Sequence, residues 1–175
     1  IDIANVMHSR ALQEVSKRAL LENINACDEV WAVSKKEEEN LRSLGYEGDY
    51  LVMPNGVDMP RQRVSEEQIQ SATKAYDLPE GVPVYLFVGR MMWYKGLRII
   101  LDALSRLKAA GKDFRMVFVG DGADRDEVEK YASQCGVSEQ CIFTGALRDR
   151  DALRAWYCRG DLFLFPSTFD TNGLV

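Results

Sequence analysis

Two cations follow a predicted strand near the middle of the chain, and their placement suits a phosphorylated ligand. The run Val84–Val88 is apolar, β-branched and aromatic, which predicts a buried strand, and Gly89 permits a sharp turn after it. Arg90 and Lys95 come next, before a helix that is predicted to begin at Leu97. Backbone N–H groups at a helix start and two cationic side chains would face one anion. A surface loop with two solvated cations is the alternative interpretation.

The composition limits the class of protein. The 175 residues suffice for one ordinary domain or for parts of two, and an apolar content of 46% allows a packed core. The net charge of −5, from 22 basic and 27 acidic residues, argues against a general nucleic-acid binder. The sequence contains no apolar run long enough to cross a membrane and no signal-peptide pattern.

Residues that bind metals are sparse in the sequence. The four cysteines form no CxxC pair and the chain has one histidine, so zinc ligation is not expected. No DxD pattern stands out, and we expect neither a catalytic metal nor another cofactor. This cysteine usage fits a reducing cytosol. We therefore expect a cytoplasmic protein, which could also work at the inner face of the membrane.

The second part of the chain alternates strands with helices. The predicted strands are 84–88, 114–119, 141–143 and 162–165. Asp124 and Asp149 are placed to cap two of the helices between them. Such alternation predicts parallel βα units in a doubly wound α/β sheet. Ligands bind at the carboxyl ends of the strands in such a sheet, and glycines and charges gather there, which favours the phosphate interpretation.

The first part of the chain carries shorter predicted elements, at 9–24, 29–33, 34–45 and 50–53. Ser34 with Glu37, and Ser65 with Gln68, form capping-box patterns that open helices. Residues 58–64 contain a proline and show little periodicity, which indicates a linker.

Short motifs follow one another in a specific order along the chain. They are Ala32-Val33-Ser34, Pro54-Asn55-Gly56-Val57-Asp58, Val88-Gly89-Arg90 with Lys95-Gly96, Gly120-Asp121-Gly122, Gly145, Asp161 to Ser167, and Gly173-Leu174-Val175. In this order they resemble the nucleotide-sugar half of a retaining glycosyltransferase with the GT-B fold, in the group known as family four or group one. The likeness runs over nearly the whole chain from residue 27, and it implies a Rossmann-like sheet that is half of a GT-B fold.

The resemblance implies a division of the chain. Residues 1–57 would be the tail of an N-terminal acceptor domain, 58–64 the interdomain linker, and 65–175 part of the C-terminal nucleotide-sugar-binding domain. We accordingly expect a fragment that is inactive alone and whose uncovered apolar surface promotes self-association. Any peripheral membrane contact would be made by the missing domain.

The resemblance also implies roles for individual residues. Arg90 and Lys95 would stabilise the charge that grows on the β-phosphate as a nucleoside diphosphate leaves, and Gly89 would let the backbone approach the phosphates. Asp170 would accept hydrogen bonds from sugar hydroxyls, with a plain loop aspartate or helix cap as the alternative. It replaces the first glutamate of the family's acidic motif, whose second acid would fall at residue 178, past the end of the chain.

Main-chain groups would complete the donor site. Gly145 and Leu147 lie where relatives hold the base, although an ordinary strand-to-helix turn is the alternative. Backbone N–H groups of Thr171, Asn172, Gly173 and Leu174 would face the diphosphate and the sugar. The Gly120–Gly122 motif is interpreted as structural, while the apolar segment Met91–Tyr94 could cover the donor, face the missing domain or simply pack within its loop.

The expected function is transfer of a hexose from a nucleotide diphosphate sugar, such as UDP-glucose, to an unknown acceptor with retention. The sequence shows no Ser/His/Asp set and no paired catalytic carboxylates, and retaining members of this group are thought to use the leaving phosphate as the base. A nucleotide-sugar epimerase or phosphorylase of similar fold, and a non-catalytic binding module, are the alternatives. The segment 168–173 resembles lipid glucosyltransferases, so the acceptor could be a lipid or a glycan, and no nucleic-acid partner is expected.

Overall fold

The structure is a computed structural model that describes residues 10–57, 62–168 and 170. The chain forms two compact units that divide between residues 58 and 59. We call the described residues before this point the first unit and those after it the second unit. Within the described residues, no helix combines the length and the hydrophobicity needed to cross a bilayer.

A four-stranded parallel sheet forms the centre of the second unit, with the strand order β5-β4-β3-β6. The strands are β3 (Val84–Val88), β4 (Arg115–Val119), β5 (Cys141–Gly145) and β6 (Leu162–Phe163). This sheet confirms the predicted doubly wound α/β class. The last strand is shorter than the predicted 162–165, although Leu164 still donates its N–H to the carbonyl of Leu86 at 2.8 Å.

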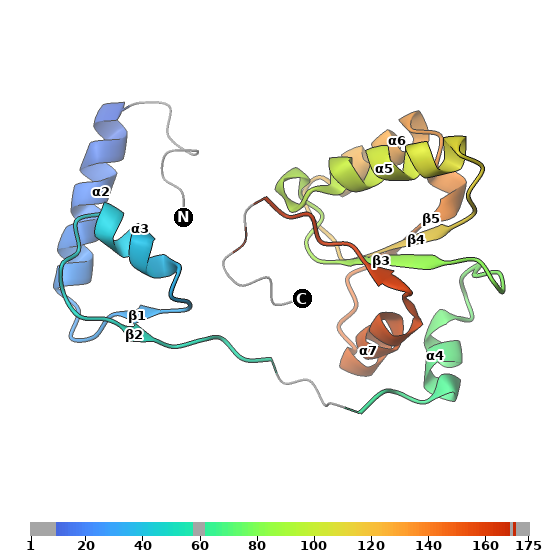
Figure 1. Ribbon diagram of the computed structural model, residues 1–175, viewed down its shortest axis with the longest axis horizontal. Coiled ribbons are helices and arrows are strands. Elements are labelled where there is room, and N and C mark those ends of the chain that lie inside the picture. The colour runs from blue at the N-terminus through green and yellow to red at the C-terminus, as the bar shows by residue number, and fades with distance from the viewer. Residues whose placement is uncertain (1–9, 58–61, 169, 171–175) are drawn as a thin grey trace. The chain divides into compact units, whose positions relative to one another are not determined.

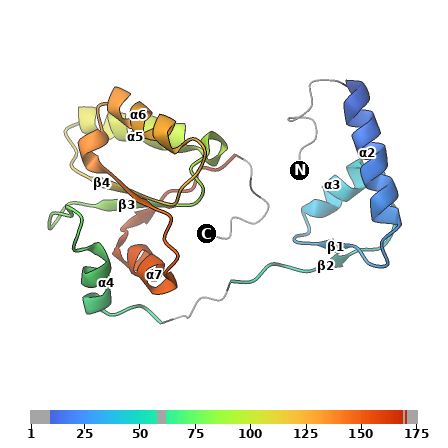
Figure 2. The same ribbon diagram turned by 180° about the vertical axis from the view of Figure 1, so that it is seen from behind.

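Helices cover both faces of this sheet (Figures 1 and 2). One face carries α5 (Leu97–Ala109) and α6 (Arg125–Gln134), and the other carries α4 (Glu66–Thr73) and α7 (Arg150–Arg159). Because side chains alternate across a strand, neighbouring strand residues enter different cores. Phe87 packs with the apolar residues of α5 and α6, whereas Leu86 packs with Trp156 of α7.

The predicted helix starts are only partly confirmed. Ser65 and Gln68 form the predicted capping box of α4, and the Asp149 carboxylate accepts the first N–H groups of α7. The predicted capping box at Ser34 is wrong, because α3 (Glu37–Ser43) begins later and no side chain caps it. The N–H of Glu37 instead donates to the main-chain carbonyl of Ser34 at 3.2 Å, which makes a turn rather than a helix start.

The first unit is small and poorly covered. It contains α2 (Arg10–Asn25), α3, and a parallel pair of two-residue strands, β1 (Trp31–Ala32) and β2 (Leu51–Val52). Only Ala32 and Tyr46 are buried hydrophobic residues among the described part of this unit. Two apolar residues of α2 are exposed, Leu12 at 56% and Val15 at 67%.

Residues 62–64, which fall in the predicted linker, belong to the second unit and pack against α7. Val64 is buried with Ala155 of α7, and the carbonyl of Gln62 accepts a hydrogen bond from Arg154 at 2.7 Å. The linker and the division into domains stay a prediction.

The direction of strand addition reverses beside β3. The chain runs outward from β3 to β4 and β5, and α7 then returns it to β6 on the other side of β3. In open α/β sheets the crevice at such a reversal, outside the carboxyl ends of the strands, is where ligands bind. Two segments leave the sheet at this place, residues 89–96 after β3 and, after β6, residues 164–168 with Asp170.

Candidate functional site

An ion pair between a buried lysine and a partly exposed aspartate joins the two segments that leave the sheet at the strand reversal. Lys95 Nζ lies 2.5 Å from Asp170 Oδ2, and only 9% of the lysine side chain is exposed. Removing an ammonium from water costs free energy unless the charge is paired, so Asp170 compensates the burial of Lys95. The rings of Tyr94 and Phe165 also lie near the ammonium, with centroids 5.3 and 5.5 Å away.

Arg90 contacts the same tyrosine. Its Nη2 donates to the Tyr94 hydroxyl at 3.2 Å, and the arginine is exposed to solvent. Tyr94, which the sequence analysis had not singled out as a site residue, therefore contacts both cations, one through its hydroxyl and one through its ring.

An exposed guanidinium and a buried ammonium that contact the same tyrosine make a suitable arrangement for a diphosphate. The planar guanidinium can bind two phosphate oxygens at once. The buried ammonium acts as a fixed point charge that needs no rearrangement when negative charge develops nearby. The structure thus connects the three predicted catalytic residues: Lys95 pairs with Asp170, and Arg90 and Lys95 both contact Tyr94.

Glycines lie at the carboxyl ends of three adjacent strands. The N–H of Gly89 donates to the carbonyl of Val119 at 3.0 Å, and the N–H of Gly120 donates to the carbonyl of Gly145 at 2.9 Å. The predicted residues Gly89 and Gly145 therefore belong to one row at the edge of the sheet. This row has little side-chain bulk, so a ligand can approach the backbone closely.

A hollow of about 240 Å³ opens beside this row. Its lining residues are Val88, Gly89, Arg90, Val119, Gly120, Asp121, Ala146, Leu147 and Leu153. The predicted residue Leu147 thus lines the hollow together with Leu153 of α7, which was not predicted as a site residue. A mostly apolar hollow with an arginine at its border suits a ligand that combines a planar organic ring with phosphate groups.

Gly96 allows the two segments to meet. Its φ of +78° lies in the left-handed region, and a Cβ at this position would collide with the main-chain carbonyl of Pro166. Beside this contact, Thr168 donates both its N–H and its hydroxyl to the carbonyl of Tyr94, at 3.1 and 3.0 Å. The close approach of segments 89–96 and 164–168 therefore depends on glycine at this position.

The remaining predicted residues, Thr171, Asn172, Gly173 and Leu174, lie outside the described residues. Their main-chain contacts to a diphosphate stay a prediction, as do the roles given to Gly145 and Leu147.

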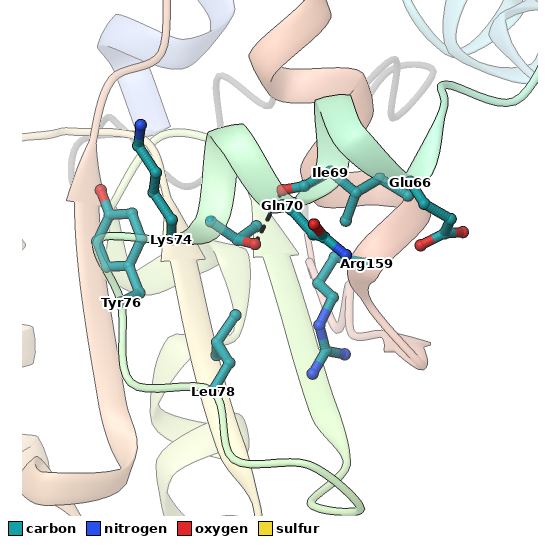
Figure 3. Close-up of a pocket in the computed structure, with 8 residues that line it drawn as sticks. Glu66, Ile69, Gln70, Lys74, Tyr76, Leu78 and Arg159 are labelled. Carbon is teal, nitrogen blue, oxygen red and sulfur yellow. Dashed lines mark hydrogen bonds between the residues drawn. The ribbon is translucent and has the colours of Figure 1, made fainter.

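A second hollow of about 400 Å³ lies on the other side of the second unit, along α4 and the end of α7 (Figure 3). None of the predicted site residues lines it. Figure 3 shows the charged ends of Glu66, Lys74 and Arg159 pointing in different directions, so these groups do not converge on one ligand.

Comparison with known proteins identifies relatives of this chain. Residues 68–175 match the family described as Glycosyl transferases group 1. A 2-deoxystreptamine glucosyltransferase from Streptomyces kanamyceticus is 35% identical over 123 residues, which is 70% of this chain and 32% of that protein. A D-inositol 3-phosphate glycosyltransferase from Xylanimonas cellulosilytica is 30% identical over 162 residues, 87% of this chain and 38% of the relative. The chain therefore spans about a third of the length of these relatives.

Solved structures show the same architecture. The Anabaena HepE structure in complex with UDP and glucose has a TM-score of 0.75 at 19% identity, and covers 90% of this chain and 43% of its own. A glycosyltransferase from Rickettsia africae has a TM-score of 0.69 at 23% identity, over 85% of this chain and 41% of its own. These likenesses confirm the predicted Rossmann-like half of a GT-B fold.

Proposed function

This chain belongs to the group 1 glycosyl transferases, and we propose that its second unit binds the nucleotide diphosphate sugar from which a hexose is transferred with retention. The observation that carries this proposal is the pairing of the buried Lys95 with Asp170, together with the contact of Lys95 and Arg90 with the same tyrosine, Tyr94, at the strand reversal of the sheet. In this crevice the cations would meet the diphosphate and the carboxylate would meet the sugar.

The cations would act on the leaving group. Breaking the bond between the sugar and the diphosphate increases the negative charge on the β-phosphate. A charge that is already fixed in place stabilises the transition state more than the ground state, and this difference accelerates the reaction. Arg90 and Lys95 would supply this stabilisation without a metal ion, and the leaving phosphate would serve as the base.

UDP-glucose is the donor that we propose. Two observations on relatives support this choice: HepE was solved with UDP and glucose, and the relative from Streptomyces kanamyceticus is named a glucosyltransferase. The relatives' names point to different acceptors and do not select one. We propose that the acceptor is a lipid or a glycan, because the sequence of segment 168–173 resembles lipid glucosyltransferases. We infer that the protein acts in the cytoplasm, at the inner face of the membrane if the acceptor is a lipid.

Calorimetry of UDP binding to the intact protein that carries this chain tests the donor site. Arg90→Ala and Lys95→Ala should each weaken binding by about 1–3 kcal/mol, as loss of a charged hydrogen bond does. Lys112→Ala is the matched control. Lys112 is exposed and precedes the amino end of β4, whereas the proposed site lies at the carboxyl ends of the strands. Unchanged UDP affinity in both site variants would refute the donor site.

A further inference from the structure

The loop between the two cations is packed into the second unit. Met91 is fully buried, and Trp93 forms the start of a short 3-10 turn, η1 (Trp93–Lys95). Among the three roles left open for the segment Met91–Tyr94, the structure favours packing. We propose that Asp124, at the start of α6, is a positioning residue that holds this loop so that Lys95 and Arg90 are placed for donor binding, an inference that rests on the proposed function.

Asp124 does not do what its position in the sequence predicts. It is the N-cap residue of α6, yet its side chain accepts no hydrogen bond from that helix, so the predicted side-chain cap is wrong. Its Oδ2 instead accepts the main-chain N–H of Trp93 at 2.8 Å, and its own N–H donates to the carbonyl of Met91 at 3.2 Å. An N-cap aspartate ordinarily satisfies the N–H groups of its own helix. Here the carboxylate accepts the main-chain N–H of Trp93, in the loop, instead.

The Gly120–Gly122 motif, which precedes α6 in the chain, also contacts this loop. The N–H of Met91 donates to the carbonyl of Asp121 at 2.9 Å. A Cβ on Gly122 would collide with the main chain of Met91, so only glycine lets the two segments approach this closely. The motif that the sequence analysis interpreted as a structural turn is therefore part of the support for the cationic loop.

The Trp93 side chain makes a second attachment to α6. Its indole N–H donates to Glu127 Oε2 at 3.0 Å, and its ring meets Tyr131 edge-on with centroids 5.8 Å apart. The Arg98 guanidinium lies 5.2 Å from the centroid of the Trp93 ring. Both the main chain and the side chain of Trp93 are thus held by α6.

The position of Trp93 also fixes the position of Lys95, because both residues belong to the hydrogen-bonded turn η1. The N–H of Lys95 donates to the carbonyl of Met92 at 2.9 Å, and the N–H of Gly96 donates to the carbonyl of Trp93 at 3.0 Å. Binding groups must be held within a fraction of an ångström by a supporting shell to be effective. Loss of the Asp124 acceptor would leave the Trp93 N–H unsatisfied and release this support.

UDP titrations of the intact protein test the inference. Asp124→Ala should raise the Kd for UDP by about threefold to tenfold, the effect of one lost hydrogen bond. Asp124→Asn, whose amide oxygen can still accept the Trp93 N–H, should bind UDP almost as the unchanged protein does. Ser65→Ala is the control, because it removes the N-cap of α4 in the same unit and should lower the unfolding temperature without changing UDP affinity.

A double-mutant cycle separates positioning from a general structural role. If Asp124 acts through Lys95, then Asp124→Ala should have little further effect on UDP affinity in a Lys95→Ala background. A full, additive effect in that background would overturn the inference, as would an Asp124→Asn variant as weak as Asp124→Ala. Should Asp124→Ala fail to fold, Glu127→Ala, which removes the exposed partner of the Trp93 indole, replaces it and should raise the Kd about threefold.

The failure of this inference differs from the failure of the proposed function. Unchanged UDP affinity in Asp124→Ala or in its replacement, with weaker binding in Arg90→Ala and Lys95→Ala, would overturn only the positioning role. Unchanged affinity in Arg90→Ala and Lys95→Ala would overturn the donor site itself.

Discussion

Asp170 has one partner in the structure and another in the proposed reaction. In the structure its carboxylate contacts the Lys95 ammonium at 2.5 Å, whereas in the proposed reaction it binds hydroxyl groups of the sugar. Both partners are hydrogen-bond donors, and a carboxylate has about four acceptor sites, so the two roles are compatible. The carboxylate does, however, place negative charge next to the proposed diphosphate site, and this repulsion opposes donor binding.

Asp170→Asn separates these effects. The amide oxygen can still accept a hydrogen bond from Lys95 Nζ, so the lysine should keep its position, while the negative charge is lost. We expect UDP to bind about threefold to tenfold more tightly, because a charge repulsion of on the order of 1 kcal/mol is removed. We also expect the rate of sugar transfer to fall, because an amide is a weaker acceptor for sugar hydroxyls.

Calorimetry with UDP and a transfer assay with UDP-glucose measure the two quantities. Weaker UDP binding in Asp170→Asn would contradict the prediction and would show that the ion pair, rather than the hydrogen bond, holds Lys95 in place.

At the scale of elements, the junction between the cationic loop and α5 depends on one glycine. Gly96 combines a left-handed backbone with close contact to the Pro166 carbonyl. These two requirements have different energetic consequences. The left-handed conformation costs an L residue about 1–2 kcal/mol, and the collision adds the cost of moving the segment after β6.

Gly96→Ala compared with Gly111→Ala isolates the second cost. Gly111 also has a left-handed φ, +70°, but a Cβ there would meet nothing within 4 Å. We expect Gly96→Ala to lower the free energy of unfolding by about 1–3 kcal/mol more than Gly111→Ala, the usual range for overpacking. Urea denaturation of both variants measures the difference. Equal losses would contradict the proposed contact between the loop and the segment after β6.

At the scale of the whole molecule, the two units differ in how much core they contain. The second unit has apolar clusters on both faces of its sheet, whereas Ala32 and Tyr46 are the only buried hydrophobic residues among the described part of the first unit. Buried apolar area is the main favourable term in folding. The first unit, taken by itself, should therefore be the less stable of the two.

Urea denaturation followed by two probes checks this expectation. We expect the helical circular dichroism of the first unit to be lost at lower urea than the fluorescence of Trp156, which is 1% exposed in the second unit. The variant Trp31→Phe removes the exposed tryptophan of the first unit, so that the remaining fluorescence reports on the second unit. A single transition, coincident for both probes, would show that the units unfold together.

The strand β6, at one edge of the described sheet, exposes apolar side chains. Leu162 and Phe163 of β6 are 52% and 40% exposed, and an unpaired apolar edge strand can associate with another chain. The self-association expected from the sequence stays a prediction.

Local sequence patterns were enough to predict the class of the fold and the two cationic site residues. Buried parallel strands are continuous apolar runs, and their ends are marked by glycine, so local patterns suffice to find β3, β4 and the residues that follow them. Arg90 and Lys95 could be identified because charged residues directly after such a strand fall at the ligand-binding edge of the sheet.

The tertiary structure decided which of these residues meet. The pairing of Lys95 with Asp170 depends on the return of the chain to the far side of β3, and strand order cannot be deduced from local periodicity. The same limitation explains Asp124. Its sequence position predicts a helix cap, but the Trp93 N–H competes for the same carboxylate, and that competitor is brought close only by the packing of the loop against α6.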